Sequence, residues 1–548
     1  MNINAAADVA LGMRDTATTI NDCFGEDGFI NTDRYLEMMM DGGDTEDDFH
    51  AMLHDDTSDH DDEGPPPKKR RKKRIILARR AENGELEAIL PTESLWYHMY
   101  IDCPQTTDSR FLKKFRRRFR HPYAQFNWFA NEEIKENWFP KWKPNGTDAA
   151  GKNSSPLKLL ILGAFRYIGR GLTFDDMEEC TAISEEVHRV FFHHFIEVGS
   201  TILYERFVKA PRVEEDLQQH MHEFQRAGMN GAFASTDASG VLHEMCTMRT
   251  KRSHQGAKHK SAQRTYNTTV NHRRRILAST PGNPGSFNDK TLILFDEFIQ
   301  DIKSGRILDD YTFELLEKRE DGEIIAVKYK GVWLIVDNGY HKWSTTVPPH
   351  TRSVNRDEIR WSEWLESMRK DVECTFGILK GRWRILKTGV RLHSTESVDK
   401  VWLTCCALHN WLLEIDGLDQ PWDGVNAATS AWTGDGEFAQ LEVSETPMAL
   451  QRILYPAEIR DYDTSTFGVI ASEEDTANII AGEEDTANAN NEAVIDAADE
   501  QFRRVRDLSL DFFRSKLVEH FNILFDDRKI VWPKRRGPRP TTPPHSHS

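Results

Sequence analysis

The sequence of 548 residues predicts an α/β fold, in which a mixed sheet is flanked by helices and preceded by a helical region. Three observations predict it. Short apolar, strand-like runs end at Asp237 and Asp337. The stretch 361–387 has the apolar spacing of an amphipathic helix, and residues 156–197 have the pattern of three short helices.

Charge is unevenly distributed along the chain, whose net charge is −17. Residues 1–64 carry 18 acidic and 2 basic side chains, and residues 413–500 carry 21 acidic and 2 basic ones. The remainder therefore has a net charge of +18. A basic body with acidic appendages favours a phosphate-backbone partner, which the overall charge alone would argue against.

Residues 1–64 are predicted to be disordered, because they are acidic and poor in aromatic residues. Residues 413–500 contain a short duplicated unit, Ser472–Ala481 and Gly482–Asn491, and are predicted to be a low-complexity linker. The run PPPKKRRKKR (Pro65–Arg74) is typical of a nuclear-import signal or a nucleic-acid patch, and a merely solvated basic linker is the alternative. The residues of this predicted signal are Lys68, Lys69, Arg70, Arg71, Lys72, Lys73 and Arg74. The predicted organisation is an acidic tail (1–64), a basic linker (65–93), a helical region (94–200), an α/β domain (201–418), an acidic linker (419–500), and a C-terminal helix with a basic tail (501–548).

The helical region has two informative segments. In Asp108–Phe129, phenylalanines at spacings of four alternate with cations, so we expect one packed face and one basic face. Leu157–Ile168, Phe174–Cys180 and Glu185–Val198 then have the outline of a helix-turn-helix unit. The last of these helices begins with two glutamates, which phosphates would repel, so a purely structural bundle is the alternative to a DNA reader.

Further along the chain, the spacing of apolar residues changes from a helical to a strand-like period. Phe233–Asp237, Arg264–Val270 and Arg274–Ser279 are predicted strands. Ile324–Tyr329 and Val332–Val336 are β-branched runs separated by a glycine, and we expect them to form a hairpin or meander.

Three carboxylates stand out. Asp237 and Asp337 each end an apolar strand-like run, and Glu373 lies beside the apolar stripe of the predicted helix 361–387. If they converge, they form an all-oxygen pocket suited to two Mg²⁺ or Mn²⁺ ions, which can activate a water or a 3′-hydroxyl against a phosphodiester. The alternative for each acid taken singly is a solvated or salt-bridged carboxylate.

Cations near these acids are candidates for holding a DNA backbone. The predicted DNA-binding residues are Lys258, Lys260, Arg273, Arg274, Arg275, Lys380, Arg382 and Arg384. Cys405, Cys406 and His409 lie in an apolar helix and are predicted to belong to the core rather than to a metal site.

Several motifs resemble the DDE transposases of the PIF/Harbinger superfamily, in particular its plant transposon protein branch. They run in order over residues 108–415, from FLKKFRRRFR through GSFNDKTLI, LIVDNGYHKW and VECTFGILKGRWRIL to CCALHNWL. The resemblance implies an RNase H-like catalytic core in residues 201–418, a two-metal mechanism with Asp237, Asp337 and Glu373 as the triad, and transposon terminal-repeat DNA as substrate. It also implies a separate Myb-like DNA-binding partner. The segment after Asp237 differs from the usual family pattern.

The sequence therefore predicts a nuclear DDE transposase that hydrolyses transposon ends and joins the freed 3′-hydroxyls to target DNA, with a homo-oligomer as a possible assembly. The alternative is a domesticated, non-catalytic DNA-binding or scaffold protein that keeps the fold. Seven cysteines without a CxxC pair and no membrane-spanning run agree with a reduced, intracellular protein.

Overall fold

The computed structural model describes residues 78–80, 86–131, 138–142, 154–256, 260–416, 418–419 and 502–530. The import signal Lys68–Arg74, both acidic stretches for the most part, the basic tail and Lys258 lie outside these residues, so the predictions for them stay predictions. No helix in the described ranges is both long enough and apolar enough to cross a membrane.

A six-stranded mixed sheet forms the centre of the fold, with strand order β10-β9-β3-β4-β5 and β6 paired to β4. Its strands are β3 (Ala232–Leu242), β4 (Gln263–Val270), β5 (Ile276–Ser279), β6 (Asn283–Pro284), β9 (Trp333–Ile335) and β10 (Thr346–Val347). β4 runs antiparallel to both β3 and β5, whereas β9 and β10 run parallel to β3. The predicted mixed sheet is confirmed.

The register of the parallel pair places two predicted acids at one level. Ser235 of β3 lies opposite Ile335 of β9. Asp237 and Asp337 each follow two residues later along chains that run in the same direction. Because side chains alternate with a period of two, both acids share a side of the sheet with the residues of this paired position.

A second sheet of three strands has the order β11-β8-β7, with β7 (Thr312–Lys318), β8 (Ile324–Lys330) and β11 (Arg503–Arg504). The expected hairpin between Ile324–Tyr329 and Val332–Val336 is therefore wrong, because β8 pairs with β7 and β9 belongs to the central sheet. The burial pattern gives the reason. β9 is buried throughout, as parallel central strands are, whereas β8 alternates between exposed and half-buried residues along most of its length. A short antiparallel pair, β1 (Ala78–Arg80) with β2 (Leu86–Ala88), precedes the rest.

Helix α15 (Arg356–Arg382) carries the third acid. The Asn355 side chain caps it by accepting a hydrogen bond from the Asp357 amide. The helix packs against the central sheet, and five residues of its predicted apolar stripe are buried: Trp361, Leu365, Met368, Val372 and Leu379. The sixth, Trp364, is half-buried. The predicted helix is confirmed, although it begins five residues earlier and ends at Arg382, before the short α16 (Ile385–Thr388).

The remaining helices around the sheets are α12 (Glu214–Arg226), α13 (Asp289–Leu294), α14 (Glu297–Ser304), α17 (Thr395–Ile415) and α20 (Leu510–Asp526). The C-terminal helix α20 packs against α15 and β7, so the end of the chain contributes to the core of this region. The sequence pattern predicted helix over 501–525, whereas residues 503–507 form β11 and a 3-10 turn.

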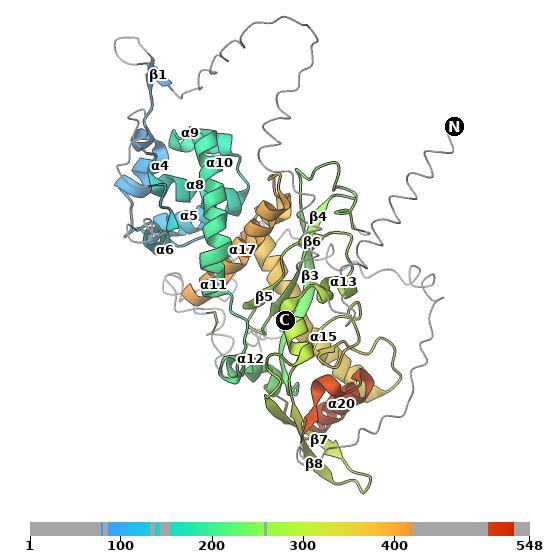
Figure 1. Cartoon of the computed structure of the whole chain (residues 1–548). Helices are drawn as coiled ribbons and strands as arrows, with labels where there is room; N and C mark the ends of the chain where they lie inside the picture. Colours follow the sequence, from blue (N-terminus) through green and yellow to red (C-terminus); the bar gives the residue numbers. More distant parts are fainter. Residues whose placement is uncertain are drawn as a thin grey trace, which may run out of the picture. The chain divides into compact units, whose positions relative to one another are not determined.

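The helical region contains α4 (Leu95–Tyr97), α5 (Ser109–Phe119), α6 (Tyr123–Phe129), α8 (Leu157–Arg170), α9 (Phe174–Thr181), α10 (Glu185–Val198) and α11 (Tyr204–Phe207). The three helices predicted for 156–197 are confirmed. Gly171, with φ of 67°, ends α8, and Thr173 begins α9 with a reciprocal capping box to Asp176. One continuous hydrophobic core includes these helices, α17 and residues of β4, and Figure 1 shows α17 against α11 and β5.

Buried histidines make the stability of this fold sensitive to acid. Burial lowers the pKa of His188 to about 4, and its Nε2 lies 2.8 Å from the hydroxyl of Thr181. Below a pH of about 6.5 the unfolded chain takes up a proton at this side chain that the folded protein does not, so its contribution to stability falls as the pH falls from about 6.5 to 4.

Replacing His188 with glutamine isolates this contribution. We expect His188→Gln to destabilise the protein near pH 8 and this deficit to shrink by about 2 kcal/mol at pH 5, because the variant has no proton to bind in the unfolded chain. Urea unfolding of both proteins at the two pH values measures the difference. An equal deficit at both pH values would show that His188 does not titrate differently on folding.

Candidate active site

Asp237 lies in the middle of β3, opposite Thr268 of β4, and Asp337 follows the end of the neighbouring strand β9. The sequence predicted a strand that ends at Asp237, whereas β3 continues to Leu242. Asp237 is 19% exposed, and its Oδ1 accepts a hydrogen bond of 2.8 Å from the Ala238 amide. Asp337 follows β9, and its Oδ1 accepts a hydrogen bond of 2.8 Å from the Gly339 amide. Burial, followed by the negative charge of Asp337, raises the pKa of Asp237 to about 7. The two acids therefore repel each other, as ligands of a shared cation would before it binds.

Glu373, on α15, is linked to Asp237 by an arginine that contacts both carboxylates. Arg369, one helical turn before Glu373, contacts Glu373 Oε1 at 2.7 Å and Asp237 Oδ2 at 3.3 Å. Its Nε also contacts Glu366 Oε2 at 3.1 Å. Burial alone would lower the pKa of Arg369, but these three carboxylates outweigh it and raise that pKa above its ordinary value. The first and third predicted acids thus meet across one guanidinium.

A fourth carboxylate stands beside the second acid. A Cβ atom added at Gly339 would lie 2.6 Å from Asp289 Oδ2 and 3.0 Å from Asp337 Oδ1, so a larger residue here would make the Asp289 carboxylate shift. The charge of Asp289 also contributes to the raised pKa of Asp237. The sequence contained a signal for it, since Asp289 lies in the GSFNDKTLI motif, but it was not predicted as a site residue.

A chain of buried, hydrogen-bonded polar side chains lies next to the acids. The Tyr340 hydroxyl donates to Asn267 Oδ1 at 2.7 Å, and Asn267 Nδ2 donates to Asp296 Oδ2 at 2.6 Å. Burial, and then the charge of Asp237 ahead of those of Asp289 and Asp337, raises the pKa of Tyr340 well above its ordinary value. This chain joins the loop after β9 to β4 and to the start of α14, and so fixes the position of the Asp337 backbone.

A cleft of about 720 Å³ lies near the acids, although none of the three acids lines it. Asn338, the residue after Asp337, lines one part of it, and Glu366 and Lys370 line another from α15. Arg352 and several hydroxyl side chains complete its wall. The acids are therefore next to a polar recess that opens to solvent.

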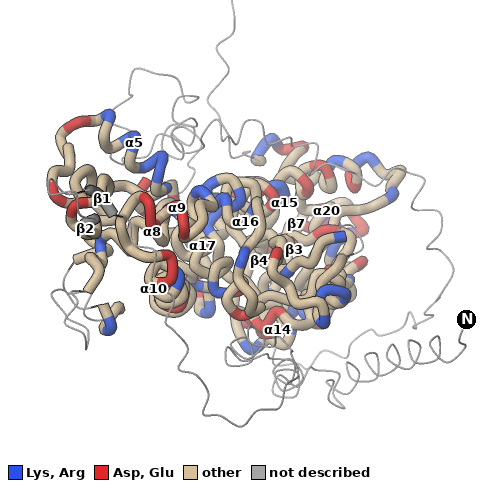
Figure 2. Tube along the Cα trace, turned by 90° about the horizontal axis from the view of Figure 1, so that it is seen from above, with Lys and Arg blue, Asp and Glu red and all other residues tan. Residues whose placement is uncertain are grey.

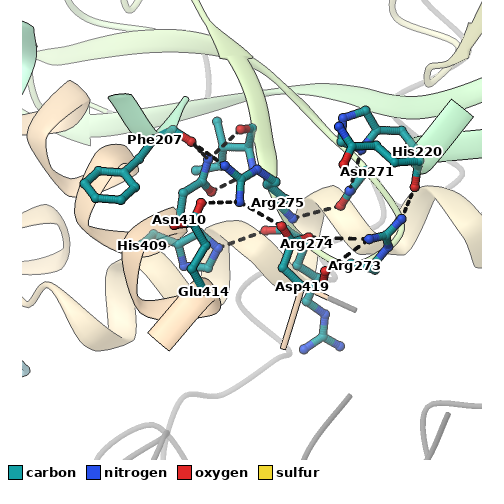
Figure 3. Close-up of polar contacts among 12 residues, drawn as sticks. Phe207, His220, Asn271, Arg273, Arg274, Arg275, His409, Asn410, Glu414 and Asp419 are labelled. Carbon is teal, nitrogen blue, oxygen red and sulfur yellow. Dashed lines mark hydrogen bonds and ion pairs between the residues drawn. The ribbon is translucent and has the colours of Figure 1, made fainter. Parts of the chain in front are cut away.

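The predicted DNA contacts Arg273, Arg274 and Arg275 are engaged within the protein (Figure 3). Arg273 is buried and its Nε lies 3.0 Å from Glu223, while Arg275 contacts Glu414 at 2.9 Å and Asp419 at 2.7 Å. The carbonyl of Arg274 accepts a hydrogen bond of 2.9 Å from His409. This placement argues against a role in DNA binding for Arg273 and Arg275, whose guanidinium groups join α12 and the chain after α17 to the sheet.

The other predicted DNA-binding residues differ in how exposed their side chains are. Arg382 is buried, and its guanidinium lies 3.4 Å from His409 Nδ1, which argues against a DNA contact there too. Lys380 is half-buried, and burial lowers its pKa to about 8. Lys260 and Arg384 are exposed. Figure 2 shows further Lys and Arg residues along α5 and around α16, where Arg384 and Lys387 lie.

The CCALHNWL motif is structural. Cys405 and Cys406 are fully buried in α17, as predicted for a core helix. Asn410 donates to the carbonyls of Phe207 and Ile276 and accepts from the Ile276 amide at 3.0 Å, so it fastens α17 to β5 and α11 (Figure 3). The raised pKa of both thiols, a result of burial, agrees with inert side chains.

The donor set suits a hard divalent cation, since Asp237, Asp337 and Glu373 present only oxygen ligands. As arranged here, no three metal-ligating side chains of the described residues are close enough together to bind an ion. A cationic group nevertheless lies among them, because the Arg369 guanidinium contacts the first and third acids. The three acids thus suit a bound cation, provided that the Arg369 side chain moves away from them.

Comparison with known proteins agrees with this geometry. Residues 244–410 match a family described as DDE superfamily endonuclease. That segment contains Asp337 and Glu373 and begins seven residues after Asp237. Protein ALP1-like from Arabidopsis thaliana is 20% identical over 277 residues, which cover 49% of this chain and 65% of that relative. No solved structure matches at a significant level. The chain therefore contains a region similar to a DDE superfamily endonuclease domain, within a mixed α/β fold of the RNase H-like type.

Proposed function

We propose that this protein is a metal-dependent DNA nuclease and strand transferase that cuts transposon ends and joins their 3′-hydroxyls to target DNA. The observation that carries the proposal is the parallel register that places Asp237 level with Asp337, with Glu373 joined to Asp237 through Arg369. The match to DDE superfamily endonucleases, a group that uses divalent metal ions on DNA, supports it. The finer assignment to the PIF/Harbinger superfamily, plant transposon protein branch, rests on the sequence motifs.

Asp237, Asp337 and Glu373 would hold two Mg²⁺ or Mn²⁺ ions. When bound, such ions supply an activated water or 3′-hydroxyl and stabilise the leaving oxygen of a phosphodiester. The protein's own contribution is to fix the acids before the reaction. Asp237 is held by the Ala238 amide and Asp337 by the Gly339 amide, while Tyr340 and Asn267 anchor the loop that carries Asp337. The cleft beside them leaves space for a substrate strand.

Exposed cations would hold the DNA backbone while the acids act. Lys260 and Arg384 are exposed, and half-buried Lys380 follows Glu373 on α15. Each cation that neutralises a phosphate releases a counterion, so its removal changes the salt dependence of binding as well as the affinity.

Replacing Arg384 or Lys260 with glutamine tests this assignment. We expect each substitution to weaken binding of duplex DNA regardless of sequence and to reduce the slope of log K against log salt by about 1. Fluorescence anisotropy over a salt series measures both quantities. Arg273→Gln is the matched control, since its buried guanidinium should affect stability but leave the slope unchanged. A wild-type slope in Arg384→Gln and Lys260→Gln would remove these residues from the interface.

Incubation of the purified protein with a terminal-repeat duplex and Mn²⁺ tests the function itself. Transposase activity predicts cleaved ends followed by strand-transfer products in a target plasmid. Cleavage without strand transfer would indicate a general metal-dependent nuclease.

A second candidate is a domesticated, non-catalytic DNA-binding or scaffold protein. The ion pairs that join Arg369 to Asp237 and Glu373 favour it, because they satisfy two of the acids without a metal. DNA binding with no cleavage in Mg²⁺ or Mn²⁺ would support this candidate.

The same proposal includes a location in the nucleus and two kinds of partner. The run Lys68–Arg74 would direct the protein to the nucleus. A Myb-like partner would supply sequence-specific recognition of the terminal repeats, and two or more copies would bring two transposon ends together. Fluorescence microscopy of the protein with and without the Lys68–Arg74 run tests the first of these.

A further inference from the structure

Arg369 has an unusual set of neighbours on α15. Its three guanidinium nitrogens contact three different carboxylates: Glu366 and Glu373 on its own helix and Asp237 on β3. Arg369 is 14% exposed, so little water is available to replace these contacts. The residue thus cross-links a helix to a strand through acids that the proposed function assigns to metal binding.

Arg369 and a divalent ion would compete for the negative charge of Asp237 and Glu373. Glu373 Oε1 lies 2.7 Å from the guanidinium, the distance of a direct charge-assisted hydrogen bond. A divalent ion bound to that oxygen would stand close to the positive charge of Arg369 and repel it. The arginine and the metal are therefore alternatives at this position.

Glu366 provides a place for the displaced arginine. It lies one turn before Arg369, is 37% exposed, and lines the cleft of about 720 Å³. Arg369 already contacts Glu366 through Nε, so it can keep this partner when its other two contacts are lost. The open cleft beside Glu366 gives the side chain space to move.

We propose that Arg369 is a positioning residue that stands in for the metal: it holds Asp237 and Glu373 together in the metal-free protein and moves to Glu366 when divalent ions bind. This inference rests on the proposed function, because it assumes that these acids bind metal. It adds that metal affinity is limited by the cost of displacing an internal cation.

Two substitutions should change metal affinity in opposite directions. Arg369→Gln removes the competing cation, so Mn²⁺ should bind about tenfold more tightly, while the metal-free protein should melt at a lower temperature because its acids lose their counterion. Glu366→Gln removes the receiving carboxylate, so Arg369 is harder to displace and Mn²⁺ should bind about threefold more weakly. Arg369→Lys keeps a charge without the forked contacts and should lie between the wild type and Arg369→Gln.

Titration of the full-length protein with Mn²⁺, in which electron paramagnetic resonance measures the free Mn²⁺, gives the affinities. Thermal melting in EDTA measures the stability of the metal-free proteins. Arg360→Gln is the matched control. Arg360 also lies on α15 and contacts Asn522 at 2.7 Å, away from the acids, so its loss should lower the melting temperature and leave Mn²⁺ affinity unchanged.

The outcomes separate the two proposals. If the wild type binds no Mn²⁺, the metal site of the proposed function is wrong. If the wild type binds Mn²⁺ but Arg369→Gln binds it no more tightly, or more weakly, Arg369 is only a structural cross-link and the inference is overturned. Tighter binding in Arg369→Gln together with weaker binding in Glu366→Gln supports it.

Discussion

Replacing Asp337 with alanine is expected to lower metal-dependent cleavage of DNA by about a thousandfold or more. Asp337 lies level with Asp237 across the parallel β3–β9 pair, so its loss removes one of two adjacent carboxylates that would hold a shared ion. Ligands that fix a metal contribute several kcal/mol of transition-state stabilisation, and each 1.4 kcal/mol is a factor of ten in rate. Single-turnover cleavage of a labelled duplex in Mg²⁺ and in Mn²⁺ measures the effect.

The matched control for this substitution is Asp310→Ala. Asp310 is a surface acid, 92% exposed and paired with Lys330, so its loss should leave cleavage unchanged. Because Asp337→Ala also relieves repulsion with Asp237, the variant should fold at least as stably as the wild type in EDTA. Unaltered cleavage by a folded Asp337→Ala protein would remove this residue from the catalytic set.

The largest effect on stability is expected at the buried ion pair between Arg116 and Asp416. Arg116 Nη2 contacts the two carboxylate oxygens of Asp416 at 2.7 and 2.5 Å, and both side chains are 7% exposed. The pair joins α5 to the end of α17, 300 residues later. Asp416→Ala leaves a buried guanidinium without this partner, so we expect the free energy of unfolding to fall by about 3–5 kcal/mol.

Urea unfolding followed by circular dichroism measures this loss. Arg110→Ala is the control on the same helix, since Arg110 is 93% exposed and lies 3.8 Å from Asp108, and it should change stability by less than about 0.5 kcal/mol. The double variant Arg116→Met, Asp416→Ala should recover part of the loss, because it buries no uncompensated charge. Equal stability of Asp416→Ala and the wild type would show that the pair contributes nothing net.

The elements with strong periodicity could be predicted from the sequence. The stripe from Trp361 to Leu379 repeats at three and four residues and predicted α15, and Thr173 and Gly171 mark the ends of helices that the structure confirms. The pairing of strands could not be predicted in the same way. β8 and β9 are neighbours in the sequence and both β-branched, but a buried parallel strand and an alternating surface strand belong to different sheets.

The sequence predicted that the three acids would lie close together, whereas the partners of the nearby arginines could not be predicted. The strand-like runs before Asp237 and Asp337 predicted that these two acids would lie close together, and the parallel pairing of β3 with β9 brings them to one level, although β3 continues past Asp237 to Leu242. An arginine near these acids can point outward to DNA or inward to a partner far along the chain. Arg273 pairs with Glu223, 50 residues earlier, and Arg369 contacts Asp237, 132 residues earlier, and neither contact has a sequence signal.

The central claim is that Asp237, Asp337 and Glu373 share divalent ions. A crystal structure of the protein grown with Mn²⁺ tests it most directly, because Mn²⁺ gives an anomalous signal that locates each ion. We expect two peaks in contact with these three carboxylates and the Arg369 guanidinium withdrawn towards Glu366. Saturating Mn²⁺ that leaves no peak at the acids, with Arg369 still joining Asp237 to Glu373, would contradict the claim.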